Sequence, residues 1–386
     1  MSTRRADDAT SVPSGFVPLP RHTFVSPEGR RLHIYGDVRG RPGGDWPRVV
    51  PAALHRRFDA LSGAWVEISP ARNVRPHTTD APSPGRPACP LCPGGPEIPF
   101  SYQAAVFDNR FPAVVPKPPA PPRGPGFGPS IGRAEVVMYT EVHEATFADL
   151  EPDALARVIA VWRDRSTELW ANPAHAFVMA FENRGELVGA TLSHPHGQVL
   201  AVDHLPPTIA ARIHALVDGR RESGHCVTCS VAERDAAERS VLANDHFVVA
   251  VPFAPRWPYE VHVRARRHDL RRLGGLRAEE QQALAAALRG LVRRYDRLFG
   301  FELPYMMTIM EAPAGVDDWH LAFEFLPPHR SERLTKVRAS VETATGLFLN
   351  DTLPEASAAR LAGVAASAEA EAPPFQVVAD EGQPIA

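Results

Sequence analysis

The segment that most constrains this chain is His194-Pro195-His196-Gly197-Gln198, in which two histidines flank a proline. In an extended segment residues i and i+2 point to the same face, so His194 and His196 can converge on one site while Pro195 fixes the backbone between them. A neutral imidazole is a nucleophile toward phosphorus and a metal ligand, and both roles are available at neutral pH. The alternative is a pair of surface histidines in a turn, and the fitting segments elsewhere in the chain make it the weaker interpretation.

The length, charge and hydropathy of the chain exclude several classes of protein. The chain has 386 residues, enough for two domains or for one large domain with a tail. Its net charge of −3 provides no basic field for nucleic acid. No apolar run reaches the length of about 18 residues that spans a membrane. The first residues, Met1 to Asp8, lack the apolar core of a signal peptide. We therefore expect a soluble cytoplasmic enzyme.

The four cysteines form two Cys-x-x-Cys pairs, Cys89/Cys92 and Cys226/Cys229. In a chain without an export signal this spacing favours metal ligation over disulfides. Each pair offers two thiolates on one tight turn, as tetrahedral zinc requires. Two alternatives remain open at this stage: all four cysteines around one metal, or two pairs of unligated thiols.

The hydrophobic pattern indicates mixed helices and strands. In the first half it predicts strands at residues 31–35, 58–69, 136–139 and 177–181, a helix at 152–170 and a turn at 183–185. In the second half it predicts strands at 247–251, 260–263, 305–310 and 320–325, and a helix at 278–299. His143 and His194 are 51 residues apart, and His268 and His320 are 52 apart. This order indicates a duplicated α+β unit whose second copy lost the nucleophile.

The His-Pro-His-Gly-Gln segment and the residues around it resemble galactose-1-phosphate uridylyltransferases, a branch of the histidine-triad superfamily. The resemblance implies an α+β fold of two tandem histidine-triad-like domains, each an antiparallel sheet flanked by helices. It places an N-terminal catalytic domain with zinc and His196 at residues 46–215 and a second histidine-triad-like domain at 216–360. Composition adds a flexible arm at 1–45 and a disordered tail at 361–386.

The residue at position 198 separates transferases from hydrolases in this superfamily. Hydrolase relatives carry a third histidine there, which can act as a general acid, whereas Gln198 only donates a hydrogen bond to the nucleotidyl phosphate. The resemblance therefore implies that UMP passes from UDP-glucose to galactose 1-phosphate through a covalent uridylyl-His196. Two alternatives are an adenylyl-transferring nucleotide phosphorylase of the same superfamily and a catalytically inactive zinc-binding module.

The resemblance also completes the expected metal site. It adds His143 and His194 to Cys89 and Cys92, a closed set of four ligands that makes the zinc structural. The repeat suggests a second zinc at Cys226 and Cys229, together with His268 and His320. Some relatives carry a peripheral iron, but this chain has Glu311 near one of its ligand positions and Ala322 and Glu324 at two others. We therefore expect no iron site.

The remaining expected contacts are with substrate. Arginine binds phosphate oxygens through two N–H groups, so the Ser-Pro-x-Arg-x-x-Arg-Pro segment at 69–76 suits a diphosphate. The resemblance implies the following substrate-binding residues: Arg72, Arg75, Leu91, Phe107, Asn109, Arg110, Asn183, Thr191, Lys336 and Glu342. Lys336 and Glu342 would contact the hexose phosphate across a homodimer interface. Phe348 stands where other members have glutamine, so the acceptor sugar is the least constrained part of the prediction.

Overall fold

The computed structural model describes residues 19–38, 46–49, 51, 53–75 and 89–364. Within them, eleven strands form one sheet in which every neighbouring pair is antiparallel. The first six strands, in sheet order, are β1 (Arg21–Val25), β2 (Arg31–Tyr35), β5 (Ala104–Asp108), β7 (Gly132–Met138), β9 (His196–Val202) and β8 (Phe177–Arg184). The other five are β13 (Tyr305–Met310), β14 (Ala322–Leu326), β12 (Val261–Ala265), β11 (Phe247–Ala250) and β10 (Ser240–Ala243).

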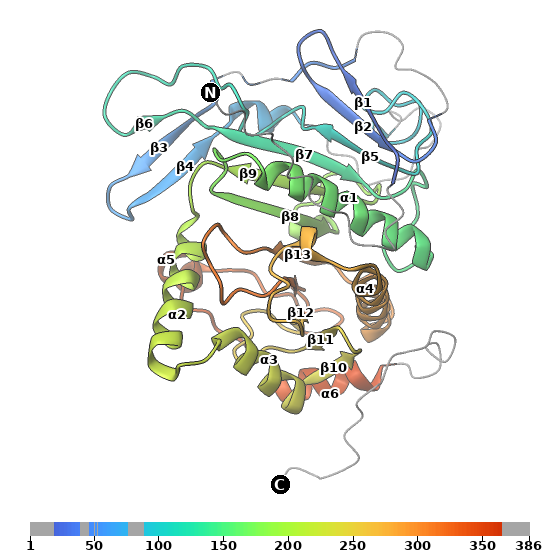
Figure 1. Cartoon of the computed structure of the whole chain (residues 1–386), viewed down its shortest axis with the longest axis vertical. Coiled ribbons are helices and arrows are strands. Elements are labelled where there is room, and N and C mark those ends of the chain that lie inside the picture. The colour runs from blue at the N-terminus through green and yellow to red at the C-terminus, as the bar shows by residue number, and fades with distance from the viewer. Residues whose placement is uncertain (1–18, 39–45, 50, 52, 76–88, 365–386) are drawn as a thin grey trace, which may run out of the picture.

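The two halves of the chain meet edge to edge inside this sheet. β8 of the first half pairs with β13 of the second, with Phe181 opposite Thr308. Figure 1 shows the N-terminal strands, in blue to green, above the C-terminal ones, in yellow and orange. Because the sheet is continuous, β8, which pairs with β9, lies at the junction between the halves.

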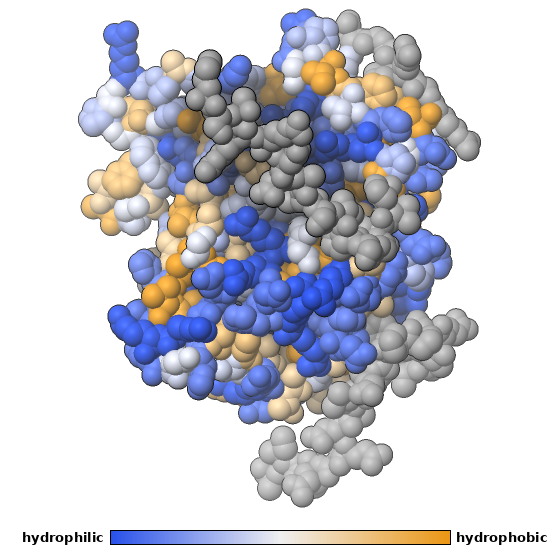
Figure 2. Space-filling model, viewed as in Figure 1, coloured by the Kyte–Doolittle hydropathy of each residue, from blue (hydrophilic) through white to orange (hydrophobic). Residues whose placement is uncertain are grey.

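A small second sheet lies beside the first half. It consists of β3 (His55–Asp59), β4 (Ala64–Ile68) and β6 (Phe127–Gly128), in the order β4-β3-β6. Leu61 at the tip of the β3–β4 hairpin is fully exposed. Figure 2 shows that the visible face of the molecule is largely hydrophilic, with a separate small group of hydrophobic side chains at the end of this hairpin.

Two long helices cover one face of the large sheet. They are α1 (Pro152–Trp170) and α4 (Ala278–Leu298), and both are amphipathic, with the apolar side facing the strands. Pro152 begins α1, where a missing N–H leaves no helical hydrogen bond unmade. The resulting core includes Val158, Trp162, Leu288, Tyr295, Val199, Val178, Phe323 and Val263.

The opposite face of the sheet carries the polar residues of β9. Side chains alternate along a strand, so Gly197 and Val199 face α1, while His196 and Gln198 face the other way. Elsewhere the second half is covered by α2 (Pro207–Ser223), α3 (Val227–Glu238) and α6 (Pro354–Gly363). Short elements complete the described chain: the 3₁₀ turns η1 (Pro70–Val74), η2 (Glu186–Val188) and η3 (Leu273–Gly275), and α5 (Ser340–Thr345).

The predicted fold class, α+β with antiparallel sheet and flanking helices, is confirmed. The helix at Pro152–Trp170 and the strands at Arg31–Tyr35 and Tyr305–Met310 have the predicted bounds. The helix predicted for residues 278–299 ends one residue earlier, at Leu298. None of the helices in the described part of the chain combines the length and apolar character that crossing a bilayer requires.

Several local predictions are wrong. The prediction of a flexible arm at 1–45 is wrong for β1 and β2, because these strands pair antiparallel within the large sheet. Residues 58–69 form parts of a hairpin rather than one strand, because Gly63 adopts φ 67° and turns the chain. The turn predicted at 183–185 begins at Gly185, since Asn183 and Arg184 still belong to β8.

Helix α6 reaches into the predicted C-terminal tail. The tail predicted at 361–386 starts too early, because α6 extends to Gly363 and buries Leu361. The rest of that tail and residues 1–18 lie outside the described residues. The boundary between residues 215 and 216 falls inside α2, and the division into 46–215 and 216–360 stays a prediction.

Candidate functional site

The His196 imidazole lies at the start of β9 with one nitrogen already engaged. Its Nδ1 is 2.7 Å from the carbonyl oxygen of His194, which makes Nδ1 the protonated nitrogen that donates. The lone pair is therefore on Nε2. Burial lowers the pKa of His196, although its bond to the His194 carbonyl acts in the opposite direction. A neutral imidazole with a fixed tautomer is the form that attacks an electrophile.

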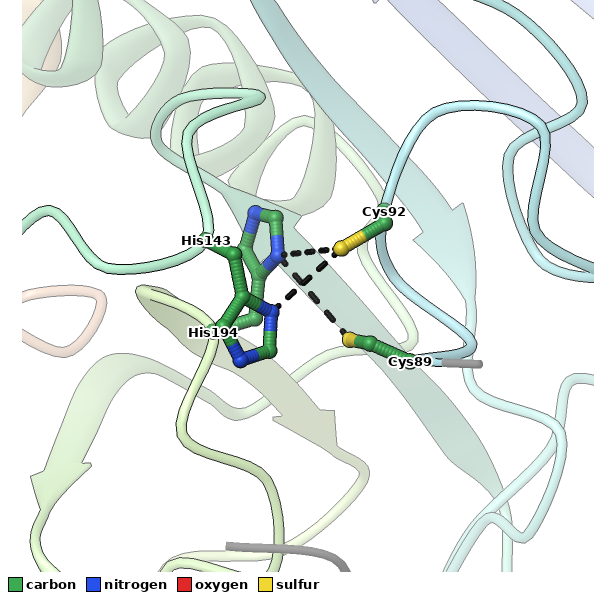
Figure 3. A group of neighbouring side chains, drawn as sticks. All are labelled: Cys89, Cys92, His143 and His194. Atoms are coloured by element: carbon green, nitrogen blue, oxygen red, sulfur yellow. Dashed lines mark hydrogen bonds between the residues drawn. The ribbon is translucent and has the colours of Figure 1, made fainter. Parts of the chain in front are cut away.

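Cys89, Cys92, His143 and His194 form one compact cluster, as Figure 3 shows. Their four ligand atoms lie within 4.8 Å of one another. The Cys92 Sγ is 3.3 Å from His143 Nδ1 and 3.5 Å from His194 Nδ1. Two sulfurs and two ring nitrogens converge on one point, which is the donor set that tetrahedral zinc takes.

The outer nitrogens of both histidines are held by neighbouring groups. His194 Nε2 is 2.8 Å from the Thr140 carbonyl and 3.1 Å from the Tyr102 hydroxyl, and His143 Nε2 is 3.1 Å from Ser193 Oγ. Such outer bonds orient the ring so that Nδ1 faces the ligand point. Burial lowers the pKa of His194 to about 4, which keeps this imidazole neutral.

Burial keeps the Cys92 thiol of this cluster protonated unless a cation is bound beside it. Burial, followed by the adjacent Cys89, raises the pKa of the Cys92 thiol to about 12. A bound divalent cation reverses this, because it stabilises the thiolates that the buried site otherwise disfavours. The residues present therefore fit a metal ion of the zinc type.

A second cluster repeats this arrangement in the other half. It contains Cys226, Cys229, His268 and His320, whose ligand atoms also lie within 4.8 Å of one another. Cys229 Sγ is 3.3 Å from His320 Nε2 and 3.4 Å from His268 Nδ1. The alternative with four cysteines around one metal is wrong, because each cysteine pair lies with two histidines of its own half.

A cavity on one side of His196 gathers most of the predicted substrate-binding residues. Its lining includes Arg72, Arg75, Leu91, Phe107, Asn109, Arg110, Thr191, His196 and Gln198. The side-chain amides of Gln198 and Asn109 are 3.4 Å apart, and Asn109 Oδ1 accepts a hydrogen bond from the backbone of Phe111. Residues that are far apart in the sequence thus line one cavity together with His196.

Arg72 and Arg75 give this cavity its positive charge. Arg72 lies in η1, and Arg75 caps its C-terminal end. Ser69 anchors the turn by donating to the carbonyl of Pro112, 2.8 Å away. Burial, followed by the neighbouring Arg75, lowers the pKa of Arg72. Neither arginine forms an ion pair with a described carboxylate, so an anion bound there would relieve their mutual repulsion.

A larger cavity lies on the other side of His196. Its volume is about 350 Å³, and its lining includes Asn183, His143 and His194. Asn183, one of the predicted substrate-binding residues, lines this second cavity. His196 lines both cavities.

Lys336 and Glu342 line neither cavity within the chain. Lys336 Nζ is 2.6 Å from Glu342 Oε1, and both side chains are buried. Lys336 also contacts the carbonyl of Leu349. The pair is thus satisfied internally, and its predicted role toward the hexose phosphate stays a prediction.

Several acidic residues at the cavities were missed in the sequence, among them Glu97 and Glu182. Glu97 lines the cavity with the arginines, and Glu182 lines the larger one. Glu97 follows Cys92 by five residues in a Gly-Gly-Pro turn, and this proximity to the metal-binding turn was the available signal. Glu182 directly precedes Asn183 on β8 but faces the core, where Tyr305 donates to its Oε1 from 3.2 Å.

The site combines a histidine with an unprotonated Nε2, a Cys₂His₂ cluster and paired arginines on an antiparallel sheet. This combination is typical of a nucleotidyltransferase. Comparison with known proteins gives the family. Residues 48–206 match the N-terminal domain of galactose-1-phosphate uridyl transferase, and residues 191–372 match its C-terminal domain. The chain belongs to this family.

Individual relatives agree with this. The chain is 37% identical over 317 residues to a galactose-1-phosphate uridylyltransferase of Thermotoga maritima, covering 80% of this chain and 98% of that relative. It is 34% identical over 363 residues to one of Streptomyces lividans, covering 88% and 96%. A solved uridylyltransferase structure superimposes with a TM-score of 0.72 at 29% identity, over 80% of this chain and 97% of the other.

Proposed function

We propose that the protein is a UDP-glucose–hexose-1-phosphate uridylyltransferase of galactose metabolism that works by a ping-pong mechanism. In the first half-reaction, Nε2 of His196 attacks the α-phosphorus of UDP-glucose. The new N–P bond replaces the P–O bond to the β-phosphate, and glucose 1-phosphate leaves with that oxygen. In the second, a phosphate oxygen of galactose 1-phosphate attacks the same phosphorus, the N–P bond breaks, and UDP-galactose forms.

The site's own residues supply what these steps need. Arg72 and Arg75 lie where they can neutralise phosphate oxygens, and Gln198 can donate its amide N–H to the transferring phosphoryl group. Gln198 has no proton to give to a leaving group, unlike a histidine, which supports transfer over hydrolysis. The backbone bond at Nδ1 keeps the His196 ring in one orientation through both steps.

One observation carries the proposal: His196 lines both cavities while its Nδ1 is fixed by the His194 carbonyl. A nucleotide in one cavity and a sugar phosphate in the other would meet at Nε2. Such an arrangement suits a covalent intermediate that one phosphate ester forms and another discharges.

The test is the intact mass of the purified protein after mixing with UDP-glucose, beside His196→Gly. A gain of one uridylyl group in the wild type alone, lost on adding galactose 1-phosphate, is the expected result. An adduct that forms only from an adenine nucleotide sugar such as ADP-glucose would reassign the protein to the adenylyl-transferring phosphorylases. An ADP-glucose phosphorylase of Arabidopsis thaliana is a relative at 25% identity.

We propose that each Cys₂His₂ cluster holds one structural zinc ion. The first would be bound by Cys89, Cys92, His143 and His194, and the second by Cys226, Cys229, His268 and His320. A closed set of four protein ligands leaves no position for substrate, so zinc there supplies cross-linking rather than chemistry. Thiolate zinc ligands suit a reducing compartment, which supports a cytoplasmic location.

We propose a homodimer in which the segment around Lys336 and Glu342 lies at the interface. Within the described chain this segment exposes a row of apolar side chains: Leu334, Val337, Val341, Leu347 and Leu349, each at least 48% exposed. Apolar surface of this density marks an interaction site. Analytical ultracentrifugation of the wild type and of Val337→Glu tests the dimer, which the charged variant should dissociate.

A further inference from the structure

Glu97 lines the cavity that contains Arg72 and Arg75. A series of contacts connects it with the segment that follows His196. Gln198, two residues beyond the nucleophile, lies 3.4 Å from Asn109, and the next residue, Arg110, lies 4.0 Å from Glu97. Leu91 and Phe107, both buried, line the same cavity. Because the α-phosphorus must be at His196, the nucleoside extends toward Glu97.

The carboxylate of Glu97 is held rigidly before any ligand arrives. Its backbone N–H donates to Pro90 from 3.2 Å, and its carbonyl accepts from Trp46 Nε1 at 2.9 Å. Oε2 forms a short ion pair with Arg30, which itself donates to the carbonyls of Pro47 and Asp108 and stacks over Trp46 and Phe107. A pre-positioned acceptor loses little entropy on binding.

The other carboxylate oxygen faces the cavity. Oε1 accepts no hydrogen bond from the described residues, and Arg110 Nη1 lies 4.0 Å from it. The cavity wall therefore presents an acceptor, Oε1, beside a donor, the Arg110 guanidinium, next to apolar surfaces for a flat ring.

This pattern matches the imide edge of uracil. Uracil presents an N3–H donor between two carbonyl acceptors, so N3–H can bond to Oε1 and a flanking carbonyl can accept from Arg110. Adenine and cytosine present a ring-nitrogen lone pair at the corresponding position, which a carboxylate repels. We infer that Glu97 is the residue that selects uracil, and that Arg110 assists it. The inference rests on the proposed uridylyl transfer.

The test compares the specificity constants for UDP-glucose and ADP-glucose, measured as adduct formation, in the wild type and Glu97→Gln. Glutamine can still accept from Arg30, so the fold is retained, but its amide can pair with either base. We expect the ratio of the two kcat/KM values to fall by ~10- to 100-fold, the usual effect of one specific polar contact in a binding site. Glu28→Gln, which loses an ion pair with Arg48 outside the cavity, should leave the ratio unchanged.

A second measurement needs no variant. UDP-glucose methylated at uracil N3 lacks the donor, so the wild type should use it ~10- to 100-fold less well than UDP-glucose. An unchanged ratio in Glu97→Gln, or equal use of the methylated substrate, would overturn the inference. So would an equal loss for both nucleotides together with sensitivity to 2′-deoxyribose, because Glu97 would then read the ribose. If the wild type forms no adduct from UDP-glucose, the proposed function itself fails, and the two failures are distinguishable.

Discussion

The His196 ring donates from Nδ1 to the backbone carbonyl of His194, 2.7 Å away, while the His194 side chain points into the Cys₂His₂ cluster. His194 therefore contributes its ring to the Cys₂His₂ cluster, and its backbone carbonyl accepts the hydrogen bond from His196. A displacement of the His194 backbone would move the carbonyl that fixes the tautomer of His196. We therefore expect a metal ion in this cluster to hold the His196 ring in place through the His194 backbone.

The first prediction concerns this coupling. His143→Asn should remove one zinc of the two that we propose and lower kcat at least about tenfold, because disturbing the surroundings of a metal site usually costs 10–100-fold. The nucleophile remains, so uridylylation of His196 should still be detectable at long times. Metal content by mass spectrometry and single-turnover kinetics measure the two effects.

The second cluster offers the matched control. His268→Asn should remove the other zinc and lower the free energy of unfolding, but change kcat much less, because His196 has no bond to that cluster. Equal losses of kcat in both variants would contradict the proposed coupling between His194 and His196.

The second prediction concerns Gly197, whose Cα faces a crowded part of the core. A Cβ at this position would lie 2.2 Å from the Tyr139 hydroxyl and 2.9 Å from the Phe181 carbonyl oxygen. Gly197→Ala should therefore destabilise the protein by about 1–3 kcal/mol and displace His196, lowering kcat. Urea denaturation and steady-state kinetics measure both.

The Tyr139 hydroxyl makes this crowding testable in a double-mutant cycle. Tyr139→Phe removes the closest atom but leaves the Phe181 carbonyl in place, so it should restore part of the stability of Gly197→Ala. Strictly additive effects of the two substitutions would show that the two residues do not interact.

The third prediction is a pH dependence of stability. Burial raises the pKa of Glu182 from 4.5 to about 7 in the folded protein. A carboxyl group whose folded pKa is raised stabilises the fold fully below pH 4.5, and this contribution is lost as the pH rises through 7. Glu182→Gln has no carboxyl group at this position, so its stability does not fall for this reason as the pH rises. Relative to the wild type it should gain on the order of 3 kcal/mol in free energy of unfolding between pH 5 and pH 8.

Urea denaturation at both pH values tests this. Glu186→Gln, at an exposed position of η2 shortly after β8, is the control and should change stability little at either pH. A gap between Glu182→Gln and the wild type that stays constant from pH 5 to pH 8 would refute the raised pKa.

The sequence predicted the Cys₂His₂ cluster of the first half, because its residues lie in short, ordered motifs. His194 and His196 are fixed by strand alternation, and Cys89 and Cys92 by a tight turn. The second cluster was predicted only as an idea from the repeat. The residues of this cluster come together because His320 precedes β14 and Cys226 precedes α3. Only the order of the elements suggested these positions.

Other features needed three-dimensional pairing. Local composition gave no strand for Arg21–Val25, which becomes ordered because β2 provides its partner. Glu97 reaches the cavity only through contacts with Arg30 and Trp46, which are distant in sequence. Lys336 and Glu342 bond to each other inside the chain, which no motif indicated.

The last prediction separates charge from geometry at the phosphate site. Arg72 shares the cavity with His196 and has no carboxylate partner among the described residues, so its guanidinium is free to bind two phosphate oxygens. Arg72→Ala should lower kcat/KM for UDP-glucose by about 100-fold, and Arg72→Lys should recover only part of it, because an ammonium group keeps the charge but not the two-pronged geometry. Arg123→Ala, at an exposed arginine outside the cavity, should leave kcat/KM unchanged. Full recovery by lysine would mean that Arg72 contributes charge alone, and the measurement is a set of initial rates at low and high salt for all three variants.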